Sequence, residues 1–356
     1  MFGKLNKPFL IAEISSNHNG NFDNAIRLIK FAKFNGASAV KLQTYTPKTM
    51  TVNSKKKYFL IKKGIWKGYN LWDLYKKACT PYSWHKKLFA YGRKIGIKIF
   101  STPFDEEAVN FLEKLNCPFY KVASFEMCDL PLIKKIASTK KPIIISTGMS
   151  SLEEIEYTYN AAKSYGAKNV SLLYCVSNYP SKISDFNLNN IKVMKNRFKC
   201  EIGFSDHSND FRIPSAAVNI GATIVEKHIR LKNVKSLDYE FSIDGQQIRK
   251  YKKYLKNNKY AKKDRSFYKK ILGKKIFFRN KSENDSKVFR RSVFVVKNIK
   301  KGDFFNKKNI RNIRPGYGVS PVFFDKILGK RSVLNIKKNE PFTKKLLIKN
   351  KLNIKL

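Results

Sequence analysis

The sequence predicts an α/β fold, a (β/α)8 TIM barrel, followed by a small β-rich domain. Within roughly 260 residues, a length typical of such a barrel, eight short apolar runs each precede a segment long enough for a helix. Each run ends in polar residues, and in a barrel all these ends meet on the face that holds the active site. A doubly wound sheet is the structural alternative, but no G-x-G-x-x-G motif follows the first run.

The predicted strands are rich in Ile, Val and Phe, as expected for strands buried on both faces. They cover Phe9–Ser15, Ala39–Tyr45, Lys98–Pro103, Phe119–Ser124, Pro142–Gly148, Asn169–Cys175, Glu201–Asp206 and Thr223–Ile229. The segments between them show helical periodicity, and the first of these ends at Gly36. Ser151 and Glu154 form a capping box, which predicts the start of a helix running to Gly166.

The ends of these strands supply the candidate site residues. They are Glu13, Lys41, Gln43, Ser101, Thr102, Lys121, Ser124, Ser146, Thr147, Ser177, Ser205, Asp206, His207, Glu226 and His228. Side chains two positions apart on a strand share a face. The pairs that point the same way are therefore Lys41 with Gln43, Ser205 with His207, and Glu226 with His228. Lys227 must point out of the barrel, toward the helices or the solvent.

His207 and His228 end adjacent predicted strands at the same end of the barrel. Two neutral imidazoles, completed by water and substrate oxygens, would hold Mn²⁺, Zn²⁺ or a similar divalent ion. Asp206 would fix the tautomer of one ring from outside the ligand set. The alternative is that each histidine is a hydrogen-bonded core or capping residue.

Lys41 and Lys121 end the second and fourth strands, among the hydroxyl groups of neighbouring strand ends. A buried ammonium group needs an anionic partner. Two of them ringed by hydroxyl donors suit a small, densely anionic ligand such as a phosphorylated carboxylic acid. The alternative is a set of ion pairs with Glu13, Glu126 or Glu226. Either of the first two acids could instead act as a general base or bind sugar hydroxyls.

The chain is strongly basic, with 73 Lys and Arg against 26 Asp and Glu and a net charge of +47. Between Arg249 and Lys281 it has 15 basic residues and one acid. Such a surface could bind nucleic acid or an anionic membrane, but its residues follow no nucleic-acid-binding motif. A compositional bias toward Lys, Asn and Ile explains the charge better, so nucleic acid is not expected as a partner.

The cysteine pattern and the apolar runs indicate the compartment. The five cysteines are scattered without a C-x-x-C pair, which argues against a disulfide framework and favours a reducing environment. No apolar run approaches the ~20 residues of a membrane span, and the N-terminus shows no secretory signal. We therefore expect a cytoplasmic protein without a membrane partner.

The chain divides into a predicted barrel domain over residues 1–275, a polar linker over residues 276–288 and a β-rich module over residues 289–356. The module contains an internal repeat, in which residues 298–305 resemble residues 335–342. Gly302 and Asn339 occupy the same place in the two copies, and both residue types tolerate positive φ. The repeat therefore predicts a shared turn, with a loop presenting Arg314 between the copies.

Along nearly the whole chain, and in order, these segments resemble the sialic acid synthase family, whose members condense phosphoenolpyruvate with an N-acylated six-carbon sugar. The matching motifs lie at Ile11–Ile14, Asn17–Gly20, Val40–Tyr45, Ser101–Phe104, Tyr120–Glu126, Ser146–Met149, Gly203–His207 and Val225–His228. The module looks like the antifreeze-protein-like (SAF) domain of that family. Lys41–Pro47 and the aromatic segment Gly64–His85 look most like the branch that makes pseudaminic acid for surface glycans; branches with legionaminic- or neuraminic-type acceptors are the alternatives.

The resemblance implies a transferase and a role for each candidate residue. Glu13 would be the catalytic base, and His207 and His228 would bind Mn²⁺, with Mg²⁺ and Co²⁺ as alternatives. Phosphoenolpyruvate would be held by Lys41, Thr102, Lys121, Ser124, Ser146, Ser177 and Ser205. The acceptor sugar would lie near Gln43, Glu126, Tyr179, Asp238 and Arg314.

The resemblance also implies a domain-swapped homodimer in which Arg314 enters the site of the partner subunit. A linker that runs outward can hardly return the module to its own barrel mouth, so geometry favours the same arrangement. A function of another class is a catalytically inactive barrel that serves as a basic nucleic-acid- or anion-binding protein. The intact set of polar strand ends argues against it, because a dead site has no need of two His and two Lys at one mouth.

Overall fold

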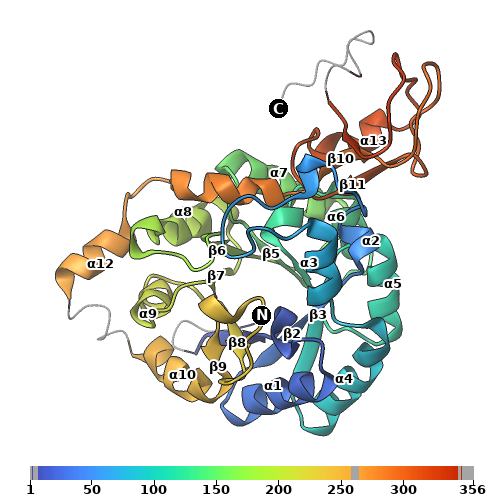
Figure 1. Ribbon diagram of the computed structural model, residues 1–356. Helices are drawn as coiled ribbons and strands as arrows, with labels where there is room; N and C mark the ends of the chain where they lie inside the picture. The colour runs from blue at the N-terminus through green and yellow to red at the C-terminus, as the bar shows by residue number, and fades with distance from the viewer. Residues whose placement is uncertain (1, 3–6, 258–263, 344–345, 347–356) are drawn as a thin grey trace.

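The computed structural model describes residues 2, 7–257, 264–343 and 346 of the 356-residue chain. Eight parallel strands follow one another around a barrel, and β1 closes it by pairing with β8 (Figure 1). The strands are β1 (Phe9–Glu13), β2 (Ala39–Thr44), β3 (Lys98–Pro103), β4 (Tyr120–Val122), β5 (Ile143–Ser146), β6 (Val170–Cys175), β7 (Ile202–Asp206) and β8 (Ile224–Arg230). Each lies within its predicted run or within one residue of it, so the predicted barrel is confirmed.

Helices surround the strands on the outside of the barrel (Figure 1). They are α1 (Phe22–Phe34), α2 (Pro47–Met50), α3 (Leu71–Ala78), α4 (Tyr82–Lys94), α5 (Glu106–Lys114), α6 (Leu130–Ala137), α7 (Leu152–Ser164), α8 (Asn189–Phe198), α9 (Arg212–Asn219), α10 (Ile248–Lys256) and α12 (Arg265–Leu272). The predicted capping box is present at the start of α7, where Ser151 and Glu154 each accept a hydrogen bond from the other's backbone N–H. A short strand, β9 (Ile243–Asp244), extends the pairing of β8.

The register of the strands brings the predicted site residues to one level. Glu13 lies opposite Lys41 on one side and opposite His228 on the other. Ser205 lies opposite Glu226 across the β7–β8 pair. The strand interiors are apolar on both faces and almost fully buried, so the polar groups gather only at the carboxyl ends of the strands.

The C-terminal module has a core of its own, built from Val293, Ile310, Phe342 and neighbouring apolar residues. It contains β10 (Ser292–Val295), β11 (Ile310–Ile313), β12 (Glu340–Pro341) and the short helix α13 (Phe324–Ile327). The predicted turn is confirmed: φ is 92° at Gly302 and 64° at Asn339. In Figure 1 the module lies at one edge of the barrel, beside α2 and α6.

The segment predicted as a polar linker is more ordered and more buried than its composition suggests. Residues Lys281–Phe289 form a 3-10 helix in which Glu283, Ser286 and Phe289 are buried. The segment lies against one side of the barrel mouth, where its polar side chains bond to the chain after β5 and at the end of β6. Among the described residues, no helix combines the length and the apolar character needed to cross a bilayer.

Candidate active site

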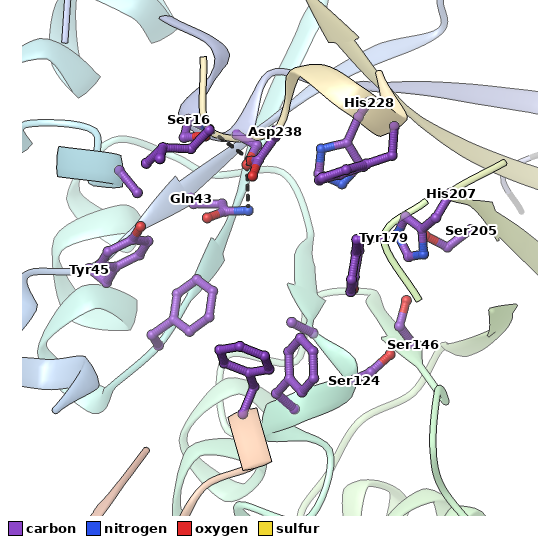
Figure 2. A pocket seen from close by; sticks show the side chains of 18 of the residues that line it. Ser16, Gln43, Tyr45, Ser124, Ser146, Tyr179, Ser205, His207, His228 and Asp238 are labelled. Carbon is purple, nitrogen blue, oxygen red and sulfur yellow. Dashed lines mark hydrogen bonds between the residues drawn. The ribbon is translucent and has the colours of Figure 1, made fainter. Parts of the chain in front are cut away.

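A pocket opens at the carboxyl ends of the barrel strands (Figure 2). Most of the predicted site residues line it: Lys41, Gln43, Lys121, Ser124, Ser146, Tyr179, Ser205, His207, His228, Asp238 and Arg314. Four others, Glu13, Thr102, Glu126 and Ser177, are buried just behind this wall. The barrel therefore brings together residues that are more than 300 positions apart in the sequence.

Two lysines and two carboxylates form a buried charge cluster on one side of the pocket. Lys41 Nζ lies 2.5 Å from Glu13 Oε2 and 3.5 Å from Glu226 Oε1, and Lys121 Nζ lies 3.3 Å from the same Glu226 oxygen. The ion pairs with Glu13 and Glu226 that the sequence offered as the alternative are thus present, and the lysines also line the pocket. Thr102 Oγ1 accepts a hydrogen bond from Lys41 at 3.3 Å.

The two carboxylates of this cluster, Glu13 and Glu226, differ in pKa. Burial raises the pKa of Glu13 to about 7, although Lys41 acts in the opposite direction. Burial also acts to raise the pKa of Glu226, but Lys121 and Lys41 outweigh it and lower that pKa to about 2. Glu226 is therefore ionised at neutral pH and sits between two ammonium groups, as a bound anion would.

Three serine hydroxyls, those of Ser124, Ser146 and Ser205, lie on the pocket wall (Figure 2). Ser124 Oγ accepts a hydrogen bond from the N–H of Gly148 at 3.0 Å, and Ser205 Oγ donates one to Glu226 at 3.2 Å. Ser146 Oγ is buried and has no hydrogen-bond partner among the described residues. An unpartnered buried hydroxyl costs free energy, which a ligand with anionic oxygens would recover.

His207 and His228 lie side by side in the pocket, with ring centroids 5.6 Å apart (Figure 2). His207 Nδ1 lies 2.8 Å from the carbonyl oxygen of Val176. Because a carbonyl can only accept, this nitrogen carries the proton and Nε2 keeps its lone pair. Burial lowers the pKa of His207 to about 4 and that of His228 well below its usual value, so both rings are neutral at pH 7.

These two rings fit a divalent metal ion. The Nδ1 atom of His228 is buried without a hydrogen-bond partner in the described part of the chain, and two neutral imidazoles are a suitable partial ligand set. Over residues 7–257 and 264–343, no group of three or more His, Cys, Asp or Glu side chains is placed to hold a metal. Water or substrate oxygens would have to complete the coordination.

The expected role of Asp206 is wrong. Its carboxylate accepts hydrogen bonds from Ser208 and from the Tyr251 hydroxyl at 2.8 Å, and it pairs with Lys227 at 3.3 Å. Successive side chains of a strand point to opposite faces, so Asp206 faces the outer helices while His207 faces the pocket. The Val176 carbonyl orients the ring instead. Lys227 points out of the barrel, as predicted, and is buried there.

Asp238, Ser16 and Gln43 lie across the pocket from Ser124 and Ser146 (Figure 2), and together with Ser15 they form a hydrogen-bonded group. Asp238 accepts a hydrogen bond from the hydroxyl of Ser15, which in turn accepts one from Gln43 Nε2 at 3.2 Å. Burial raises the pKa of Asp238. The group offers both donors and acceptors, which suits a polar ligand with hydroxyl or amide groups.

Arg314 enters the pocket from the module and lies against Glu126. Its guanidinium donates to both carboxylate oxygens of Glu126, at 2.8 and 3.0 Å, and to the Tyr75 hydroxyl at 3.1 Å. Arg291 donates to the same carboxylate at 3.2 Å. Both oxygens of Glu126 are thus occupied by arginine. The module of a single chain reaches its own barrel mouth here, so the geometric argument that it could not is wrong.

Several pocket residues were missed by the sequence reasoning. Cys175 ends β6 and lines the pocket, and its place at a strand end could have identified it. Phe241 and Phe289 also line the pocket, but they come from 3-10 helices outside the strands. Trp66 and Tyr75 line it too, and they lie in the aromatic segment Gly64–His85 that the sequence had singled out. Arg291 is buried through contacts with residues more than 160 positions away, for which the local sequence carries no signal.

Fold and site together define a TIM-barrel enzyme with a pocket of charged and polar side chains at the carboxyl ends of its strands. The chain matches the NeuB family over residues 28–266 and the SAF domain over residues 290–348. The protein therefore belongs to the NeuB family, and the family resemblance found in the sequence is confirmed.

Relatives of known name match over nearly the whole chain. The chain is 39% identical to "Pseudaminic acid synthase" of Campylobacter jejuni over 94% of this chain and 95% of the relative. It is 34% identical to "N,N'-diacetyllegionaminic acid synthase" of the same species over 94% and 99%. Among solved structures, spore coat polysaccharide biosynthesis protein SpsE of Bacillus subtilis has a TM-score of 0.81 at 28% identity, covering 96% of this chain and 95% of that one.

Proposed function

We propose that the protein condenses phosphoenolpyruvate with 2,4-diacetamido-2,4,6-trideoxy-L-altrose and water, to give pseudaminic acid and phosphate. The observation that carries this proposal is the pocket that places Lys41, Lys121 and three serine hydroxyls around one space, with two neutral histidines beside it. The higher identity to pseudaminic acid synthases than to the legionaminic acid synthases supports this acceptor. Legionaminic- and neuraminic-type acceptors are the alternatives.

The chemistry divides among the residues as follows. A divalent ion held by His207 and His228, which we propose to be Mn²⁺, would supply a Lewis acid for the aldehyde of the open-chain sugar. The lysines and serines hold the phosphoenolpyruvate anion by charge and hydrogen bonds, so that its alkene carbon C3 faces the aldehyde carbon. The alkene electrons form a C–C bond between these two carbons while the π bond of the aldehyde breaks. The aldehyde oxygen takes up a proton and becomes a hydroxyl, and positive charge develops at C2.

Water then adds to C2, and its proton passes to a base, for which Glu13 is our candidate. At the resulting tetrahedral centre, the bond between C2 and the phosphate oxygen breaks and the new hydroxyl group loses its proton. This releases phosphate and leaves the keto acid. Lys41 pairs with Glu13 at 2.5 Å and faces the pocket, so it links the proposed base to the bound anion.

The acceptor side of the pocket is consistent with a deoxygenated sugar. Apolar and aromatic side chains form much of its wall: Met50, Leu74, Tyr75, Ala78, Phe104 and Phe125. Such a wall contacts a methyl group well and offers few partners to a hydroxyl. The group around Asp238 and the guanidinium of Arg314 would bind the acetamido and hydroxyl groups.

A comparison of three acceptor sugars, each assayed separately, tests the proposed substrate. We expect the purified protein with Mn²⁺ and phosphoenolpyruvate to release phosphate with the L-altrose acceptor at least ~100-fold more efficiently than with its legionaminic-type counterpart or N-acetylmannosamine. Phosphate release with each acceptor alone measures this. Preference for another acceptor would support the proposed condensation reaction but refute the proposed acceptor sugar. No phosphate release with any of the three would refute the proposed reaction.

We further propose that the enzyme works as a homodimer that exchanges its C-terminal modules. Domain swapping exchanges identical elements, so the contacts of Arg314 with Glu126 and Tyr75 form equally well between two chains. The free thiols of all five cysteines and the use of phosphoenolpyruvate support a cytoplasmic location for this assembly.

Mixing two inactive variants tests the exchange. Co-expressed Arg314→Ala and His228→Ala chains should recover about a quarter of wild-type activity, because half of randomly formed dimers are mixed and each mixed dimer has one complete site. Without exchange, each chain lacks one residue of its own site and no activity returns. Tags on the two chains verify that mixed dimers form, so an inactive mixed dimer would refute the exchange.

A further inference from the structure

We propose that Arg279 and Glu283 position the two loops that hold phosphoenolpyruvate. This inference rests on the proposed use of that substrate. The two residues lie four positions apart in the segment between barrel and module, and Arg279 Nη1 lies 3.8 Å from Glu283 Oε2. Together they bond to the loop after β5 and to the loop after β6, on the wall of the pocket described above.

Arg279 binds backbone carbonyl groups of both loops. Its guanidinium donates to the carbonyl of Thr147, to that of Ser150 at 3.1 Å and to that of Cys175 at 2.8 Å. Three carbonyls from two strand ends are thus gathered on one planar cation. A lysine, as a single point of charge, could not reach all three in this geometry.

Glu283 binds the backbone N–H groups of the same two loops. Its Oε1 accepts hydrogen bonds from Met149 at 2.9 Å and from Ser177 at 2.8 Å. Glu283 is 2% exposed and Met149 and Ser177 are likewise buried. The linker, rather than the barrel, therefore satisfies these polar groups, and without Glu283 both N–H groups would be buried unpaired.

The first of these loops begins directly after Ser146, the last residue of β5, and the second contains Ser177; both serines are proposed phosphoenolpyruvate ligands. The two loops also pack very closely, because a Cβ added to Gly148 would lie 2.0 Å from Ser177 Oγ. A small shift of either loop would therefore move both hydroxyls. The charged pair acts on the substrate only through these loops, and Asp238 and Arg314, which we propose contact the acceptor, receive no bond from it in the described structure.

Full-length Glu283→Ala and Glu283→Gln variants test this assignment. Glu283→Ala should raise the KM for phosphoenolpyruvate at least 10-fold, while the KM for the acceptor changes less than 3-fold. Glu283→Gln keeps an acceptor oxygen for both N–H groups, so it should restore the KM to within about 3-fold of the wild type. Asp285→Ala is the matched control, because Asp285 lies in the same segment and pairs with exposed Lys63 at 3.0 Å.

A second variant and a binding measurement keep the test decisive. If Glu283→Ala does not fold, Arg279→Lys should raise the same KM by a smaller factor with normal folding. Calorimetric titration measures the dissociation constant of phosphoenolpyruvate in the absence of an acceptor sugar. This test therefore remains valid even if the acceptor in the proposed function is wrong. Equal changes in both KM values, or a Gln variant as impaired as the Ala variant, would overturn the proposal.

Discussion

His228→Ala should lower phosphate release by about 10³-fold in kcat/KM, which corresponds to about 4 kcal/mol of lost transition-state stabilisation. The ring of His228 is buried beside His207 and is neutral at pH 7. Its loss leaves one imidazole, which is too few protein ligands to retain a divalent ion in an open site. Chelation of the wild type should cause a similar loss, which added Mn²⁺ reverses in the wild type but not in the variant.

The control for this prediction is His85→Gln. His85 is also buried, but it bonds to Thr44 at 2.8 Å and lies near the Pro81 carbonyl at 3.1 Å, away from the pocket. The His85→Gln enzyme should have a lower thermal stability than the wild type, with unchanged metal affinity and an unchanged response to chelation. Phosphate release and equilibrium dialysis against Mn²⁺ measure both properties. A His228→Ala enzyme that still binds metal and turns over would contradict the assigned ligand pair.

Lys121→Met should raise the KM for phosphoenolpyruvate by about 100-fold, or about 3 kcal/mol. Lys121 is buried and lies 3.3 Å from Glu226, and burial lowers its pKa. Without it, one ammonium, that of Lys41, must balance both Glu226 and the incoming anion. The net charge facing the substrate therefore falls by one in a site with little water to screen the difference.

Lys227→Met is the control that separates the expected rise in KM from the general effect of losing a buried lysine. Lys227 is as buried as Lys121, but its ammonium contacts Asp206 and the Ser208 carbonyl on the outer side of β8. The substitution should lower the free energy of unfolding and leave the KM for phosphoenolpyruvate unchanged. Steady-state kinetics and chemical denaturation together give both values. Equal KM effects in the two variants would refute the assigned anion site.

Much of the fold could be predicted from the sequence because a parallel barrel repeats one local pattern. The eight apolar runs located all eight strands, and the period of two along each strand told which side chains share a face. The turns at Gly302 and Asn339 were predictable for a similar reason, since positive φ restricts residue type. These features depend on neighbours in the chain, which the sequence displays directly.

The remaining features depend on contacts between distant segments. The polar composition of residues 279–286 correctly indicated that they lie outside a strand. It could not indicate that Arg279 and Glu283 form hydrogen bonds with buried backbone groups of the barrel loops. For Glu126 the sequence suggested a lysine partner, a general base or a sugar ligand, and only the fold shows that two arginines bind its carboxylate. For Asp206, adjacency to His207 suggested contact where strand alternation prevents it.

The position of Arg314 late in the chain has a consequence for biosynthesis. The barrel and its lysines and histidines emerge from the ribosome well before the arginine that closes the pocket, so a barrel that folds during translation has an open mouth until the module docks. Catalytic competence then appears only after the module has been made and folded. A chain that ends before residue 314 would keep the residues proposed to hold the metal and phosphoenolpyruvate, and would lack Arg314, which we propose contacts the sugar.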